Sequence, residues 1–272
     1  MLSSHIHRNQ YEAMPPSLLP TVIDMTEQQH VNMTYSMFKE HLSANSKALS
    51  YLINDRGIKR EIINQFSLGY ASLPICKDFK AVDNPEALTG LLKRTGIVGS
   101  KGHHIFLGSV IFPVKQHGHV VGGMGRRISD VVRHTSTPYP FHLIDESALF
   151  NTECLTEQPN SVVLCKSPLE ALSAVGQGIE NIISLVGYCD FNESHAKLLK
   201  SHKVKVVKVA FNQSTYYLHK ISAIAQLLNK YRIRCKVVEL NDWQDINVLT
   251  LYDPSGKTMR QRLRQAQLYG GH

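Results

Sequence analysis

The sequence predicts an α/β protein in two lobes, of which the second is a mostly parallel sheet with helices on both faces. From residue 161 onward, apolar runs typical of buried strands alternate with stretches of helical periodicity. The strands are expected at 161–165, 181–186, 204–211 and 233–239, and the helices at about 168–177, 192–201 and 215–230. With 272 residues, the chain is also long enough for two modest domains that each have a hydrophobic core.

The first lobe is expected to mix helices and strands. Helical patterns cover 26–42, about 45–54 and 59–65, and strands at 110–114 and 119–127 flank a turn at 116–118. Residues 1–24 contain Pro15, Pro16 and Pro20 and no periodicity, which indicates a linker or arm. The predicted organisation is an arm at 1–24, an N-terminal subdomain at 25–152, the sheet domain at 153–252 and a short basic segment at 253–272.

Composition excludes several classes of protein. A hydrophobic content of 43% and a charged content of 19% fit a soluble globular protein. No apolar run approaches the roughly 18 residues that span a membrane, and the first 20 residues lack the apolar core of a secretory signal. The five cysteines are far apart and form no CxxC pair, so we expect neither disulfides nor a zinc site, and a location in the reducing cytoplasm.

The turn after the first strand of the second lobe is the most informative stretch. The apolar run at 161–165 is followed by Lys166 and Ser167, and Ser167 is a predicted helix N-cap. Pro168 suits the first turn of the helix that follows. Lys166 and Ser167 should therefore lie at the carboxyl end of a buried strand, which is where ligands bind in open α/β sheets.

This stretch resembles the first motif of the Toprim domain, in which a hydrophobic strand is followed by Glu-Gly-x-x-Asp and a helix. At the corresponding positions, Lys166 replaces the glutamate and Glu170 replaces the aspartate. The second Toprim motif, Asp-x-Asp, corresponds here to Asn212 and Ser214, and the third acidic cluster keeps one carboxylate, Asp245.

Further segments resemble, in the same order, the RNA polymerase core of bacterial DnaG-type primases. The matching segments are 48–58, 62–71, the strand ending in Phe112-Pro113, the glycine-rich stretch ending in Arg126-Arg127, 136–138, Phe141-His142 and 149–151. The resemblance runs from about residue 30 to about residue 255 and omits that family's zinc module and helicase-binding domain. It implies a primase-like core whose second lobe is Toprim-like.

The replaced carboxylates change what the resemblance implies about catalysis. Magnesium prefers oxygen ligands and usually binds one or two carboxylates, and two such ions can activate a hydroxyl and stabilise a leaving pyrophosphate. At an effective dielectric of about 20, a charge about 4 Å away is worth roughly 4 kcal/mol, so Lys166 opposes a weakly held cation. Its ammonium could instead bind a phosphate. We expect no catalytic residue, no bound metal and no other cofactor, with Glu170 and Asp245 as residual acids.

The positive charge of the chain is concentrated in one block. The net charge is +8, yet residues 194–238 contain ten lysines and arginines and no acidic residue. Such a block favours a phosphate-binding face over its alternative, a solvated lysine-rich surface. The resemblance adds Arg126 and Arg133, which match positions that contact the template in the primase family. The predicted nucleic-acid-binding residues are Arg126, Arg133, Lys166, Lys203, Lys205, Lys208, Arg232 and Arg234.

Three functional hypotheses remain open. The first is a primase-like protein, linked to DNA replication on a plasmid, phage or other mobile element, that binds single-stranded DNA or template-primer nucleic acid without metal chemistry. The second is an active primase, a DNA-directed RNA polymerase, or a nuclease with a displaced metal site rebuilt by Glu170, Asp190, Asp242 or Asp245, of which Glu170 and Asp245 are favoured. The third is an accessory protein that binds a replicative helicase or polymerase.

Overall fold

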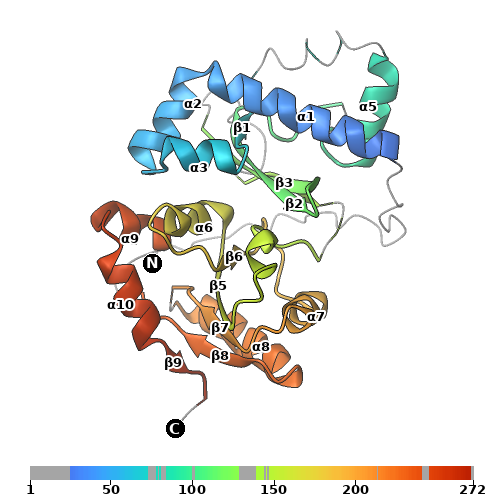
Figure 1. Cartoon of the computed structure of the whole chain (residues 1–272). Helices are drawn as coiled ribbons and strands as arrows, with labels where there is room; N and C mark the ends of the chain where they lie inside the picture. Colours follow the sequence, from blue (N-terminus) through green and yellow to red (C-terminus); the bar gives the residue numbers. More distant parts are fainter. Residues whose placement is uncertain are drawn as a thin grey trace, which may run out of the picture.

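The computed structural model describes residues 25–72, 78, 80, 84–99, 102–128, 139–143, 145, 147–212, 214–240 and 245–270. It has two sheets, one in the upper and one in the lower part of the view in Figure 1. The predicted arm at 1–24, Arg133 and Asp242 fall outside the described residues. Within the described part, no helix combines the length and the apolar character needed to cross a membrane.

The first sheet is antiparallel and has the order β1-β2-β3-β4. Its strands are β1 (Gly69–Tyr70), β2 (Ser109–Gln116), β3 (His119–Arg127) and β4 (Phe141–Leu143). Strands β2 and β3 confirm the predicted hairpin, whereas β4 was not predicted. The strand β1 begins at Gly69, where a Cβ atom would lie 2.5 Å from the Cβ atom of Phe38, so this close approach of helix and strand requires glycine.

Helices of the first lobe pack against this sheet. They are α1 (Met25–Ser43), α2 (Ser46–Ser50), a π-helix (Tyr51–Asp55), α3 (Arg60–Gln65) and α5 (Pro85–Arg94). The helix predicted at 45–54 is therefore divided into an α-helical turn and a π-helical turn, and α5 was not predicted.

The second sheet has the order β6-β5-β7-β8-β9. Strands β5 (Ser161–Cys165), β6 (Ile182–Ser184), β7 (Val206–Val209) and β8 (Arg234–Val237) are parallel, as predicted, although three of them are shorter than the apolar runs. The strand β9 (Gln267–Leu268) pairs with β8 in the antiparallel direction and was not predicted.

Both faces of the second sheet are covered by helices (Figure 1). Val162 and Leu164 of β5 belong to an apolar cluster that includes α7 (Glu193–Ser201) and α8 (Thr215–Lys230). Val163 and Cys165 point to the other face, where the cluster includes α6 (Pro168–Val175), α9 (Ile246–Tyr252) and α10 (Lys257–Gln265). The same cluster contains Phe112 of β2, so one core joins the two lobes.

A buried histidine pair in the first lobe makes its stability depend on pH. Tyr35 and His142 share a hydrogen bond of 2.5 Å, and burial lowers the pKa of His142 to about 3 and that of His104 to about 4. The unfolded chain takes up protons near pH 6.5 and the buried rings do not, so stability is lost as the pH falls below 6.5. We expect each buried ring to lower the free energy of unfolding by about 2 kcal/mol between pH 7 and pH 5.

Denaturant unfolding at pH 7 and pH 5 measures this loss. The variant His142→Gln keeps a hydrogen-bond partner for Tyr35 and does not titrate, so its free energy of unfolding should fall less between the two pH values. An equal fall in parent and variant would contradict the assignment to His142.

Candidate functional site

The turn from β5 into α6 has the predicted geometry. Ser167 is the N-cap of α6 in an extended conformation, its side chain accepts a hydrogen bond from the backbone N–H of Glu170, and Pro168 occupies the first turn. A serine cap satisfies one of the free amide groups at the start of the helix, and proline removes another. Lys166 therefore lies at the carboxyl end of β5.

Glu170 is a buried carboxylate that joins two helices. It is only 3% exposed, its Oε1 accepts from the Ser167 hydroxyl at 3.1 Å, and its Oε2 accepts from the backbone N–H of Ile246 at 3.3 Å. Burial raises the pKa of Glu170 to about 7, while the Lys166 ammonium acts to lower it and the Asp245 carboxylate acts to raise it. The carboxylate thus holds the first turn of α6 against the start of α9.

Lys166 stands over an aromatic ring. Its Nζ atom lies 4.9 Å from the ring centroid of Tyr217, in the first turns of α8. This is a cation–π distance. Lys166 and Tyr217 are 51 residues apart in sequence, and they meet because the strands β5 and β7 that precede them are neighbours in the sheet.

Asn212 and Ser214 follow β7, the strand beside β5 in the sheet. Strands β5 and β7 are parallel neighbours with Leu164 opposite Val209, so the residues that follow them reach the same edge of the sheet. Ser214 is the N-cap residue of α8, and its backbone N–H donates to Asn212 Oδ1 at 3.4 Å. We call the residues that follow β5 and β7, together with the starts of α6, α8 and α9, the carboxyl edge.

The remaining acids predicted for a displaced metal site have separate structural partners. Asp245 is the N-cap of α9, and its Oδ1 accepts from the backbone N–H of Val248 at 2.9 Å. Asp190 forms an ion pair with Lys220 at 2.5 Å. Among the described residues, no group of three histidine, cysteine, aspartate or glutamate side chains is arranged to hold a metal ion.

Arg126 belongs to a cluster of two arginines and two tyrosines. Its Cζ atom lies 5.5 Å from the ring centroid of Tyr139, and Arg56 lies 5.1 Å from that of Tyr51. Arg56 Nε also donates to the Tyr51 hydroxyl at 2.8 Å, and burial raises the pKa of Tyr51 although Arg126 acts to lower it.

This arginine–tyrosine cluster adjoins the carboxyl edge through α9. Asn247, two residues after Asp245, donates from Nδ2 to the backbone carbonyl of Arg56 at 2.8 Å. Arg56, Tyr51 and Tyr139 were not predicted from the sequence as site residues. The signal for Tyr51 and Arg56 was the segment 48–58, which resembles the primase core.

The predicted nucleic-acid-binding residues of the second lobe are spread along the sheet and do not gather around Lys166. Lys203, Lys205, Arg232 and Arg234 lie at the amino ends of β7 and β8, at the opposite end of the sheet from Lys166. Lys208 lies within β7 opposite Lys236, and burial followed by repulsion from Lys236 lowers its pKa.

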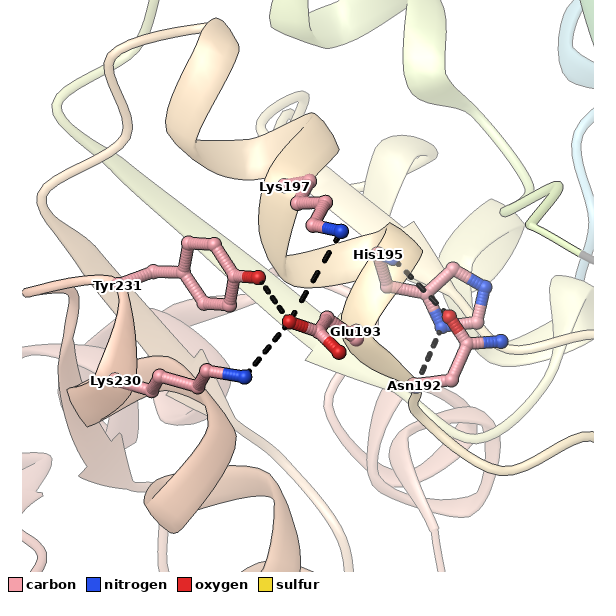
Figure 2. A network of polar contacts seen from close by, with 6 residues as sticks. All are labelled: Asn192, Glu193, His195, Lys197, Lys230 and Tyr231. Carbon is pink, nitrogen blue, oxygen red and sulfur yellow. Dashed lines mark hydrogen bonds and ion pairs between the residues drawn. The ribbon is translucent and has the colours of Figure 1, made fainter.

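Three other lysines of the block are held by acids outside it. Figure 2 shows Lys230, Tyr231 and Lys197 around the carboxylate of Glu193, at 2.8, 2.5 and 3.9 Å. Hydrogen bonding from Lys230 is the main cause that lowers the pKa of Glu193 to about 2. The network ties the start of α7, where Asn192 and His195 form a capping box, to the end of α8. Lys220 is the third lysine, paired with Asp190. These lysines therefore have a structural use.

Comparison with known proteins gives similar matches by sequence and by structure. Residues 37–139 match the family described as DNA primase catalytic core, N-terminal domain. The DNA primase of Clostridium acetobutylicum is 24% identical over 216 residues, which cover 76% of this chain and 36% of that protein. The DNA primase of Borreliella burgdorferi is 24% identical over 187 residues, covering 62% and 34%. The chain thus spans about a third of the length of these curated relatives.

Two solved structures have the same fold. The zinc-binding and RNA polymerase domains of the Aquifex aeolicus primase superpose with a TM-score of 0.77 at 22% identity, covering 91% of this chain and 62% of that one. A DnaG primase catalytic domain bound to single-stranded DNA superposes with a TM-score of 0.76 at 18% identity, covering 89% and 82%.

Proposed function

From the premise that this chain has the fold of a DnaG primase catalytic core, we propose that it is a primase-like DNA replication protein that binds single-stranded or template DNA without metal-dependent primer synthesis. The observation that carries the proposal is the pairing of Lys166 with Tyr217 at a strand end where the Toprim motif has a glutamate.

The contacts near the carboxyl edge support single-strand binding. Three cations lie over tyrosine rings there: Lys166 over Tyr217, Arg126 over Tyr139 and Arg56 over Tyr51. Proteins that bind single strands combine positive charge along the backbone with aromatic rings on which bases stack. One similar solved structure is a primase catalytic domain bound to single-stranded DNA, which is a statement about that protein.

The donor set at the carboxyl edge does not fit a magnesium site. A cation and two neutral side chains, Lys166, Asn212 and Ser214, occupy the positions where the Toprim motifs place acids. Both oxygens of Glu170 already accept hydrogen bonds, and Asp245 caps α9. Neutral oxygens can coordinate magnesium but do not neutralise it.

Primer synthesis and DNA binding should separate in parallel assays. We expect the protein to bind single-stranded template with an affinity that falls steeply as salt rises, because bound phosphates release counterions. We expect no primer product with magnesium or manganese. The variant Lys166→Gln/Arg126→Gln removes two of the three cation–tyrosine pairs and should weaken binding. A parent protein that fails to bind DNA at low salt would refute the proposal.

A second candidate function is an active primase or nuclease that uses Glu170 and Asp245. The observation that favours it is that the two carboxylates lie near enough for the charge of Asp245 to raise the pKa of Glu170, at the same edge as Lys166. Metal-dependent product that is lost in both Glu170→Gln and Asp245→Asn would establish this alternative, provided that both variants remain folded.

A further inference from the structure

We propose that the amino ends of β7 and β8 form a second contact surface for a nucleic-acid backbone, made by Lys203, Lys205, Arg232 and Arg234. We call these four residues the amino edge. The inference rests on the proposed function for its ligand class, and it adds a site at the end of the sheet opposite to Lys166.

The amino edge is compact because the two strands that carry it are neighbours. The backbone N–H of Arg234 donates to the carbonyl of Lys205 at 3.0 Å, and Arg234 is the register partner of Val206. Adjacent strands lie about 4.8 Å apart, so four cations lie within a few strand spacings of one another. All four residues are exposed.

The four cations are not neutralised within the described part of the chain. The ion pairs of the basic block there involve Lys197, Lys220 and Lys230, and none joins an amino-edge cation to a carboxylate. The described ion pairs outside the block involve His41 and Arg94. The charge of the amino edge is therefore available to an external anion.

Two of these cations occupy backbone positions that normally favour glycine. Lys203 follows α7 with φ 61° and Arg232 follows α8 with φ 57°. Each is followed by a residue whose backbone N–H donates a hydrogen bond back to the preceding helix. The N–H of Val204 donates to the Leu199 carbonyl at 3.1 Å, and the N–H of Ile233 donates to the Leu228 carbonyl at 2.9 Å. This bond pattern ends a helix with a left-handed residue, for which glycine is usual because it lacks a Cβ atom.

The helix dipole does not account for these two positions. A cation near the carboxyl end of a helix is favourable, but Lys200 and Lys230 already supply one in the last turn of α7 and of α8. A further cation at the left-handed position gains little from the dipole and strains the backbone. The feature that Lys203 and Arg232 share at these positions is an exposed charge.

An exposed tyrosine pairs through its backbone with the strand that carries Arg234. The backbone N–H of Tyr269 donates to the carbonyl of Cys235, the neighbour of Arg234, and the residue is 41% exposed. A ring next to backbone-binding cations suits the stacking of an unpaired base. A single strand and a duplex share the same backbone phosphates, so the experiment compares both.

The test replaces both left-handed cations by glycine and measures stability and binding together. In the variant Lys203→Gly/Arg232→Gly, we expect the melting temperature to stay at or above that of the parent, because strain is removed. Loss of two phosphate contacts should lower the slope of log affinity against log salt by about 1.4 for a single strand or about 1.8 for a duplex. Near 0.15 M salt this corresponds to a roughly tenfold weaker affinity for a single strand.

Two further variants keep the test decisive. His117→Gly relieves a left-handed residue (φ 50°) in the hairpin of the first lobe and should leave the salt slope unchanged. Lys205→Gln/Arg234→Gln removes the other two cations without touching a left-handed position, and should lower the slope by the same amount as the glycine variant.

The outcomes separate this inference from the proposed function. If both amino-edge variants keep the parent slope on single strand and duplex while Lys166→Gln/Arg126→Gln lowers it, the amino edge is not a site and the proposed function stands. If the amino-edge variants lower the slope and the Lys166→Gln/Arg126→Gln variant does not, the amino edge is the site and the proposed carboxyl-edge contact is wrong.

Discussion

Millimolar magnesium or manganese should leave the thermal unfolding of this protein unchanged, whereas a variant with Lys166→Glu, Asn212→Asp and Ser214→Asp should melt at a higher temperature with either ion. A ligand that binds only the folded state adds about 2.7 kcal/mol at roughly a hundred times its dissociation constant. For a chain of this size, that corresponds to a rise of about 5–10 °C. The measurement is a thermal melt with and without metal, at constant ionic strength.

The expected gain follows from charge at the carboxyl edge. The three substitutions remove one cation and add three anions close to Glu170 and Asp245, which supplies the oxygen donors that magnesium prefers. The control Lys166→Gln removes the cation without adding an anion and should show no metal-dependent shift. A shift in the parent that Glu170→Gln or Asp245→Asn abolishes would instead identify these acids as a working metal site.

The sequence predicted the second sheet well because its local and long-range preferences agree. The apolar run at 161–165, the Ser167 cap and Pro168 each specify a strand followed by a helix, and the structure has β5 and α6 at these positions. The same agreement places β7 and β8 within their apolar runs. The two-residue strand β9 was not predicted because no apolar run marks it. Both of its residues are exposed, and only the pairing with β8 defines the strand.

For the candidate site, the sequence predicted which residues lie at the strand ends but did not predict the contacts that these residues make. Lys166, Asn212 and Ser214 could be placed at one edge because the carboxyl ends of parallel strands meet there. The bond from the Ile246 N–H to Glu170 joins residues 76 positions apart, which no local pattern specifies. The separation of the amino edge from Lys166, in contrast, could have been predicted: Lys203 and Arg232 precede predicted strands, whereas Lys166 follows one, so strand direction alone places them at opposite ends.

Replacing Glu170 by glutamine should flatten the dependence of stability on pH between about 4.5 and 7. The folded-state pKa of Glu170 is raised to about 7 from its ordinary value of 4.5, mainly by burial. In this range the folded protein therefore binds a proton that the unfolded chain has released. The contribution of Glu170 to the free energy of unfolding is therefore at its maximum below pH 4.5. It decreases as the pH rises from 4.5 and is lost once the pH has passed 7. At 1.36 kcal/mol per pH unit, the loss is about 3 kcal/mol.

Glutamine is the matched replacement because it keeps an acceptor for the Ile246 N–H and carries no charge. Chemical denaturation of parent and Glu170→Gln across pH 4–8 gives a difference in stability in which the buried histidines cancel, because both proteins contain them. Relative to the parent, the variant should gain about 3 kcal/mol between pH 4.5 and 7 and nothing further above pH 7.5. In the background Lys166→Gln, the midpoint of this gain should move to higher pH, because the ammonium that lowers the Glu170 pKa is gone. A difference that does not change with pH would show that Glu170 stays ionised in the folded protein, which would restore it as a candidate metal ligand.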